Sequence, residues 1–163
     1  MACITNRVLK GRRSHVVVEA NPLAVPLIEE NRTLNQCDFE IVNAAIAYGR
    51  ETVTFTPALE FWGNSLEQKE GTEPVTVKTI RLGDIVEQKK MRSFTLICDI
   101  EGYEYDLVQH EADVLKHAET IILETHARMI GEAKNLELLS KLDEIGFEKI
   151  DEDASVIVLR RSV

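Results

Sequence analysis

The stretch FTLICDIEGYEYDLV, residues 94–108, decides the fold. Its first five residues are mostly apolar and predict a short buried strand. Three acids follow within six positions, Asp99, Glu101 and Glu104, and Gly102 lies between them. Open α/β sheets bind ligands beyond the carboxyl ends of their strands. The stretch therefore predicts a strand that opens directly into a polar site.

Apolar strands alternate with amphipathic helices along the rest of the chain. The expected strands are residues 15–19, 39–43, 52–56, 75–80, 94–99 and 120–124, followed by a hairpin of 147–150 with 155–160. The expected helices are residues 21–35, 81–90, 103–117 and 133–146. Such alternation predicts an α/β fold with a mostly parallel sheet and a terminal antiparallel pair. A long polar loop with the single tryptophan, Trp62, separates two strands expected to be antiparallel, 52–56 and 75–80.

Two of the expected helices have recognisable apolar faces. In the helix at 133–146, that face contains Leu136, Leu139 and Leu142. The helix at 21–35 is expected to start with Asn21 as its N-cap and Pro22 in its first turn. Its expected apolar face contains Leu23, Leu27, Ile28 and Leu34.

Composition limits the classes of partner. The 163 residues suit one domain over 1–163, with 44% hydrophobic and 29% charged residues. The net charge of −9 argues against broad electrostatic binding to nucleic acid or to anionic membranes. No apolar run approaches the roughly 20 residues of a membrane helix, and the first fifteen residues do not resemble a secretion signal. We expect a cytoplasmic protein.

Neither the cysteines nor the histidines show a metal-binding pattern. Cys3, Cys37 and Cys98 are far apart and form no CxxC pair, which argues against a disulfide framework or a zinc site and favours a reducing compartment. Cys98 is expected in the core. The four histidines form no HExxH motif, so no metal site is predicted.

Three expected strands end in an acid, namely Glu19, Asp99 and Glu124. One such acid is ordinary, whereas three at the ligand-binding edge of a sheet predict a shared functional cleft. A carboxylate at the position of Glu19 has a specific use, because its two oxygens can accept hydrogen bonds from the two hydroxyls of a ribose. The glycine-rich turn that normally accompanies this acid is missing from the residues before it.

Two segments resemble FkbM-type methyltransferases: TNRVLKGRRSHVVVEANPLAVPLIEENRTLNQCDFEIVNAAIAYG and VKTIRLGDIVEQKKMRSFTLICDIEGYEYDLVQHEADVLKHAETIILETH. The shared pattern includes a strand that ends in an acid followed by Asn-Pro, and the stretch TIRLGDIV. It continues with a strand closing in Asp-x-Glu-Gly-x-Glu and another closing in Glu-x-His. The resemblance covers roughly residues 5–130.

The resemblance implies a class I methyltransferase fold, Rossmann-like, with helices on both faces of the sheet. It implies S-adenosylmethionine as cofactor and a small-molecule or sugar hydroxyl as acceptor, while homo-oligomer formation stays open. The implied cofactor-binding residues are Glu19 at the ribose, Asn21 in the adjoining turn, Asn43 and Ala44 near the adenine, and Asp99.

The resemblance also assigns the catalytic side. Asp99 and Glu101 would face the methyl-transfer cleft, and Glu124 and His126 would line the acceptor side. The general base would be His126 or Asp99, since a hydroxyl acceptor must lose its proton. Glu104 is expected to begin the following helix, where a carboxylate complements the helix dipole.

The sequence departs from the family pattern at its beginning. Family members have a first strand and a glycine-rich loop before the helix whose end corresponds to MACITNRVL, and we therefore expect an N-terminally truncated domain. Three explanations stay open: a fragment of a longer protein, a gene model begun at an internal methionine, or a sheet in which 15–19 pairs directly with 94–99.

Two other functions are compatible with parts of the sequence. A non-catalytic methyltransferase-like remnant, acting as an interaction module, would account for the missing glycine-rich loop. A nicotinamide dehydrogenase would also place Glu19 on a ribose, but the chain lacks its glycine fingerprint and this class leaves the acids at 99–104 unexplained.

Overall fold

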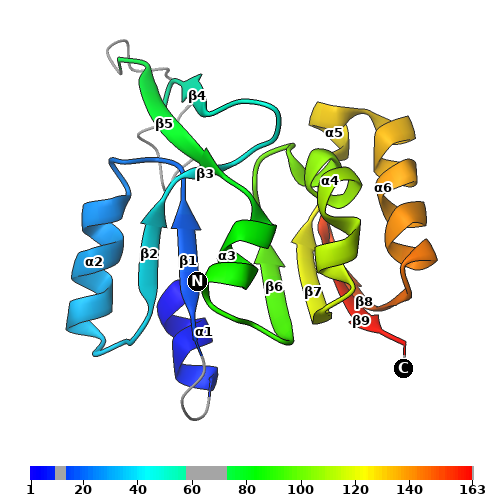
Figure 1. The fold of residues 1–163 in the computed structure, drawn as a ribbon, viewed down its shortest axis with the longest axis horizontal. Coiled ribbons are helices and arrows are strands. Elements are labelled where there is room, and N and C mark those ends of the chain that lie inside the picture. The colour runs from blue at the N-terminus through cyan, green and yellow to red at the C-terminus, as the bar shows by residue number, and fades with distance from the viewer. Residues whose placement is uncertain (10–13, 58–72, 163) are drawn as a thin grey trace. The chain divides into compact units, whose positions relative to one another are not determined.

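A computed structural model describes residues 1–9, 14–57 and 73–162 (Figure 1). Its residues group into two compact units. The first unit comprises Met1–Ala45 and Arg50–Thr79, and the second comprises Ile46–Gly49 and Ile80–Val163. The expectation of one domain over 1–163 stays a prediction.

The first unit contains a short parallel strand pair. Its elements are α1 (Ala2–Val8), β1 (Val16–Glu19), α2 (Val25–Leu34), β2 (Glu40–Asn43) and β4 (Thr52–Phe55). β3 (Ala45–Ile46) and β5 (Val75–Ile80) lie where the chain passes from one unit to the other. β1 and β2 pair in parallel, with Glu19 opposite Asn43. These two polar side chains therefore meet at the carboxyl end of the pair.

A second sheet has the strand order β3-β5-β4. β4 and β5 are antiparallel, which confirms the prediction, and Thr54 and Thr76 share a hydrogen bond of 2.8 Å between their hydroxyls. Cross-strand threonine pairs of this kind stabilise a sheet face. The polar loop with Trp62 lies mostly outside the described residues.

The second unit contains a mixed four-stranded sheet in the order β6-β7-β9-β8. Its elements are α3 (Leu82–Gln88), β6 (Phe94–Cys98), α4 (Glu104–Leu115), β7 (Ala118–Glu124), α5 (Ala127–Ile130), α6 (Glu132–Glu144), β8 (Phe147–Asp153) and β9 (Val156–Arg161). β6 and β7 are parallel, and β8 and β9 form the predicted terminal hairpin. Figure 1 shows α4 close to β7, with α6 beside α4.

The core of the second unit contains residues of the helices α4 and α6 and of the four-stranded sheet. It includes Leu107 and Leu115 of α4 and Cys98 of β6, all buried, as expected for that thiol. In α6 the buried leucines are Leu138 and Leu142, whereas Leu136 is 65% exposed. Of the predicted face, Leu142 is buried and Leu139 packs against the core, so the prediction is wrong only for Leu136, whose place is taken by Leu138, the i, i+4 partner of Leu142.

The helix α2 also differs from the prediction. It begins at Val25 with Pro26 in its first turn, and none of its residues is buried. Asn21 does not cap this helix. Its Oδ1 accepts the backbone N–H of Leu23 at 3.0 Å, which makes a turn of the Asx type before the helix.

The mixed α/β class is confirmed. The described strands form three sheets, with parallel pairs β1–β2 and β6–β7. The single mostly parallel sheet, the helices on both of its faces and the N-terminal truncation stay predictions. No helix among the described residues has the length and apolar character needed to cross a membrane.

Candidate functional site

The turn after β6 places the acids of the opening stretch. Asp99 follows the strand, Glu101 has φ +52° and Gly102 has φ +98°. Two successive residues in the left-handed region turn the chain sharply before α4 begins at Glu104. Gly102 permits this conformation without strain, as predicted, whereas Glu101 adopts it with a side chain.

Glu104 is completely buried, and its carboxylate organises this turn. Oε1 accepts the backbone N–H of Ile100 at 3.1 Å, and Oε2 accepts that of Gly102 at 3.0 Å. Oε1 also lies 2.9 Å from Nδ1 of His126. Glu104 lies at the start of α4, as predicted, but the sequence did not indicate its contacts with Ile100, Gly102 and His126. A buried carboxylate needs such donors, because an unpaired buried charge is strongly destabilising.

His126 follows β7, and its ring joins Glu104 to the two exposed acids. An ionised carboxylate only accepts hydrogen bonds, so the contact with Glu104 places the ring proton on Nδ1. Nε2 then faces Oε2 of Glu101 at 3.3 Å and Oδ1 of Asp99 at 3.7 Å. The His126 side chain is 14% exposed, against 56% for Asp99 and 77% for Glu101. Glu104 thus fixes the imidazole through Nδ1, and Nε2 faces Asp99 and Glu101.

Asp99 lies in a strongly negative environment. Burial raises the pKa of its carboxyl group, and the charges of Glu124 and Glu101 raise it further, while His126 opposes them. Glu124 ends β7, and its Oε1 accepts a hydrogen bond from the Ser155 hydroxyl at 3.1 Å. Among the described residues, no Lys or Arg forms an ion pair with these three acids. The structure thus gathers all four predicted catalytic residues into one group with Glu104.

The predicted cofactor residues of the first unit form a second group. Oε1 of Glu19 accepts the backbone N–H of Asn21 at 2.7 Å. Nδ2 of Asn43 donates to the carbonyl oxygens of Glu19 at 2.7 Å and Ala20 at 3.3 Å. The N–H of Ala44 donates to the carbonyl of Glu19 at 3.2 Å. Within the described residues, Oε2 of Glu19 accepts no hydrogen bond, so one oxygen of a fixed carboxylate is free.

A further buried acid was not predicted. Glu111 lies inside α4 with non-helical backbone angles and is 1% exposed. Its Oε1 lies 3.3 Å from Nε of Arg81 and 3.4 Å from the backbone nitrogen of Gly83. Burial and the charge of Glu111 raise the pKa of Tyr48, whose ring stacks on His110. These contacts join α3 to α4, and we interpret them as structural.

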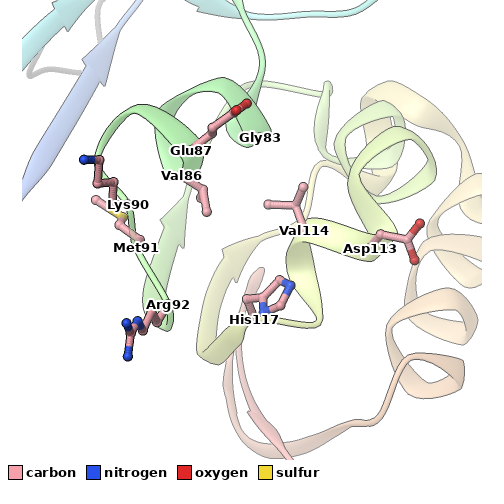
Figure 2. A pocket seen from close by; sticks show the side chains of 9 residues that line it. All are labelled: Gly83, Val86, Glu87, Lys90, Met91, Arg92, Asp113, Val114 and His117. Atoms are coloured by element: carbon pink, nitrogen blue, oxygen red, sulfur yellow. The ribbon is translucent and has the colours of Figure 1, made fainter.

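An open groove of about 540 Å³ lies elsewhere in the second unit. Figure 2 shows Val86 of α3 and Val114 of α4 on its two sides, and Lys90 and Arg92 near the start of β6. His117, the residue before β7, also lines it. The groove is therefore at the amino ends of these strands, away from Asp99 and His126. Because α/β folds bind ligands at the carboxyl ends, the acid–imidazole group is the stronger candidate site.

Comparisons with known proteins give one result. The family model described as the methyltransferase FkbM domain matches residues 2–149. The match includes both groups of predicted site residues. The searches of curated proteins and of solved structures gave no match.

Proposed function

Since the chain belongs to the methyltransferase FkbM domain family, we propose that it transfers a methyl group from S-adenosylmethionine to a hydroxyl of a small molecule or sugar. The family match over residues 2–149 is the observation that carries the proposal. We also propose a cytoplasmic setting, on the cysteine pattern of the sequence.

The group at the ends of β1 and β2 fits the ribose of the cofactor. The Asn21 N–H fixes one carboxylate oxygen of Glu19, and Asn43 and Ala44 fix its backbone carbonyl. The free oxygen, Oε2, is then available to accept a hydrogen bond from a ribose hydroxyl. Asn21 shapes the turn next to this carboxylate, while Asn43 and Ala44 would lie near the adenine.

The group at the ends of β6 and β7 fits the removal of a proton from the acceptor. When bound, S-adenosylmethionine supplies a methyl group whose bond to sulfur breaks as the acceptor oxygen attacks the carbon. His126 would take the hydroxyl proton at Nε2, while Glu104 holds its Nδ1 proton and fixes the ring. Glu104 would stabilise the imidazolium that forms through its Nδ1–H, as the aspartate of a catalytic triad does, and the negative charges of Asp99 and Glu101 would add to this. Glu124 would line the acceptor side.

Calorimetric titration with S-adenosylmethionine tests the proposal. We expect saturable binding to the unmodified chain, and at least about tenfold weaker binding to Glu19→Ala, because the variant loses a charged hydrogen-bond acceptor for the ribose. Glu30→Gln is the matched control, since Glu30 is an exposed acid on α2 of the same unit. We expect no change in its affinity.

Two results would contradict the proposal. A folded chain that binds no S-adenosylmethionine would favour the non-catalytic remnant. Equal loss of affinity in Glu19→Ala and Glu30→Gln would show that general charge, rather than a ribose contact, controls binding. Circular dichroism of each variant establishes that it is folded before the titration.

A further inference from the structure

We propose that Asp99, Glu101 and His126 form a binding site for a divalent transition-metal ion, with Mn²⁺ as a representative. Each of the three offers one ligand atom, and these atoms all lie within 4.8 Å of one another. The sequence did not predict this site, because its ligands come from the ends of two different strands and match no local metal motif.

The distances fit one shared ion after small side-chain movements. Ligand atoms at about 2.1 Å from an ion lie about 3.0–3.6 Å apart for angles of about 90–120°. Nε2 of His126 is 3.3 Å from Oε2 of Glu101 and 3.7 Å from Oδ1 of Asp99. Both carboxylates are more than half exposed, so they can rotate into place, whereas the imidazole is already fixed.

Glu104 provides the outer support that metal-binding histidines require. A histidine ligand usually donates its second ring N–H to a carboxylate or carbonyl, which fixes the tautomer and aims the free nitrogen at the ion. The Nδ1 of His126 lies 2.9 Å from the carboxylate of Glu104, which is itself completely buried and held by two backbone N–H groups. This arrangement lies outside the three ligands and independently points Nε2 toward them.

Charge and exposure favour a cation with open coordination positions. Asp99 and Glu101 supply two negative charges, and Glu124 adds a third nearby. Within the described part of the chain, no Lys or Arg pairs with these acids. Three protein ligands on an exposed surface leave positions for water or a substrate oxygen, the arrangement typical of catalytic rather than structural metal sites.

The mixed ligand set favours a transition metal over magnesium. Imidazole nitrogen suits Zn²⁺, Fe²⁺ and related ions, and carboxylates suit Mn²⁺, whereas Mg²⁺ prefers oxygen ligands alone. A bound ion would lower the pKa of a coordinated hydroxyl, whose proton would then pass to solvent water instead of to His126, since Nε2 would be occupied as a ligand. This catalytic role rests on the proposed function, but ion binding itself does not.

Titration of chelator-treated protein with Mn²⁺, followed by electron paramagnetic resonance of the free ion, tests the site. We expect a single saturable site in the unmodified chain and at least about tenfold weaker binding in Asp99→Asn, Glu101→Gln and His126→Gln. Glu104→Gln should also weaken binding by about tenfold or more, since outer-shell partners commonly have that effect. Asp113→Asn is the control, because Asp113 is an exposed acid of the same unit that pairs with Lys116.

Co²⁺ absorption gives a second readout that a purely structural role of Glu104 would not change. We expect Glu104→Gln to shift the Co²⁺ spectrum, because the ligand imidazole loses its orienting carboxylate. Mg²⁺ should compete much less effectively than Zn²⁺ for the Mn²⁺ site.

The absence of saturable Mn²⁺ binding would overturn the proposal. Unchanged affinity in both Asp99→Asn and Glu101→Gln would also overturn it, and these exposed positions keep the test valid even if the His126 variant does not fold. No cofactor or acceptor is present in the titration. A failure here is therefore distinct from a failure to bind S-adenosylmethionine.

Discussion

The two groups of candidate residues occupy equivalent positions in their sheets yet differ in charge. Glu19 and Asn43 lie at the carboxyl ends of the parallel pair β1–β2. Asp99 and the turn that leads to His126 follow the parallel pair β6–β7. In the first group, one backbone N–H holds the carboxylate of Glu19, and an amide holds the backbone carbonyl of the same residue. In the second, acids surround an imidazole.

This difference in charge suits the two groups to different tasks. The first group is suited to the recognition of hydroxyls, and the second to proton or cation chemistry. A single carboxylate fixed by neutral groups is suited to accept hydrogen bonds from hydroxyls without changing its own charge. Clustered carboxylates around an imidazole instead favour the uptake of positive charge, as a proton or as a metal ion. The end of a parallel strand pair is thus a general place for a site, and the side chains placed there decide its chemistry.

The largest expected effect comes from removing the buried acid of the second group. Glu104→Ala leaves the N–H groups of Ile100 and Gly102 and the Nδ1 of His126 without their acceptor. We expect the free energy of unfolding to fall by about 3 kcal/mol or more, as for other broken buried pairs. Urea denaturation followed by circular dichroism measures this change.

Asp106→Asn is the matched control for that comparison. Asp106 also lies in the first turn of α4, but it is exposed. A role limited to the helix dipole predicts similar losses for the two variants, each below about 1 kcal/mol. If Glu104→Ala also lost less than about 1 kcal/mol, the result would contradict a stabilising role for the buried contacts of Glu104. A loss several times larger than that of Asp106→Asn would support this role.

The sequence was most informative where the signal is local. Apolar runs that end in acids located the strands β1, β6 and β7, because strand periodicity and polar termini are encoded in consecutive residues. The turn at Gly102 was likewise predictable, since few other residues adopt its positive φ without strain. The acid-ended strands also identified Glu19 and Asp99 as candidate site residues.

The features that the sequence did not reveal depend on contacts between distant residues. Glu104 and His126 are 22 positions apart, so neither the burial of the acid nor the orientation of the ring follows from local pattern. The buried face of α6 depends on which side of the helix faces α4. As a result Leu138 is buried, whereas Leu136 is exposed. Tertiary packing of this kind regularly overrides a small shift in apolar periodicity.

A smaller effect is expected from loosening the first group. Asn43→Ala removes the hydrogen bonds that join the end of β2 to the carbonyls of Glu19 and Ala20. We expect a loss of about 1 kcal/mol in the free energy of unfolding, together with weaker binding of S-adenosylmethionine in the calorimetric titration. Asn31→Ala, on the exposed surface of α2, should change neither quantity. Unchanged affinity of Asn43→Ala for S-adenosylmethionine would show that this amide does not contribute to cofactor binding.

The smallest expected effect has the opposite sign and tests the contrast in charge directly. Asp99→Asn removes one carboxylate from beside Glu101 and Glu124, and this relieves repulsion in the second group. We expect a gain in the free energy of unfolding of less than about 1 kcal/mol, because the Asp99 side chain is largely exposed and solvent screens its charge. Thermal unfolding at pH 8 with a chelator present measures the change without a bound ion. Glu19→Gln is the matched control and should give no gain, since the Glu19 carboxylate accepts a backbone N–H, which favours its charged form. Equal shifts in the two variants would show that the groups do not differ in charge density, and the assignment of proton or cation chemistry to the second group alone would then lose its basis.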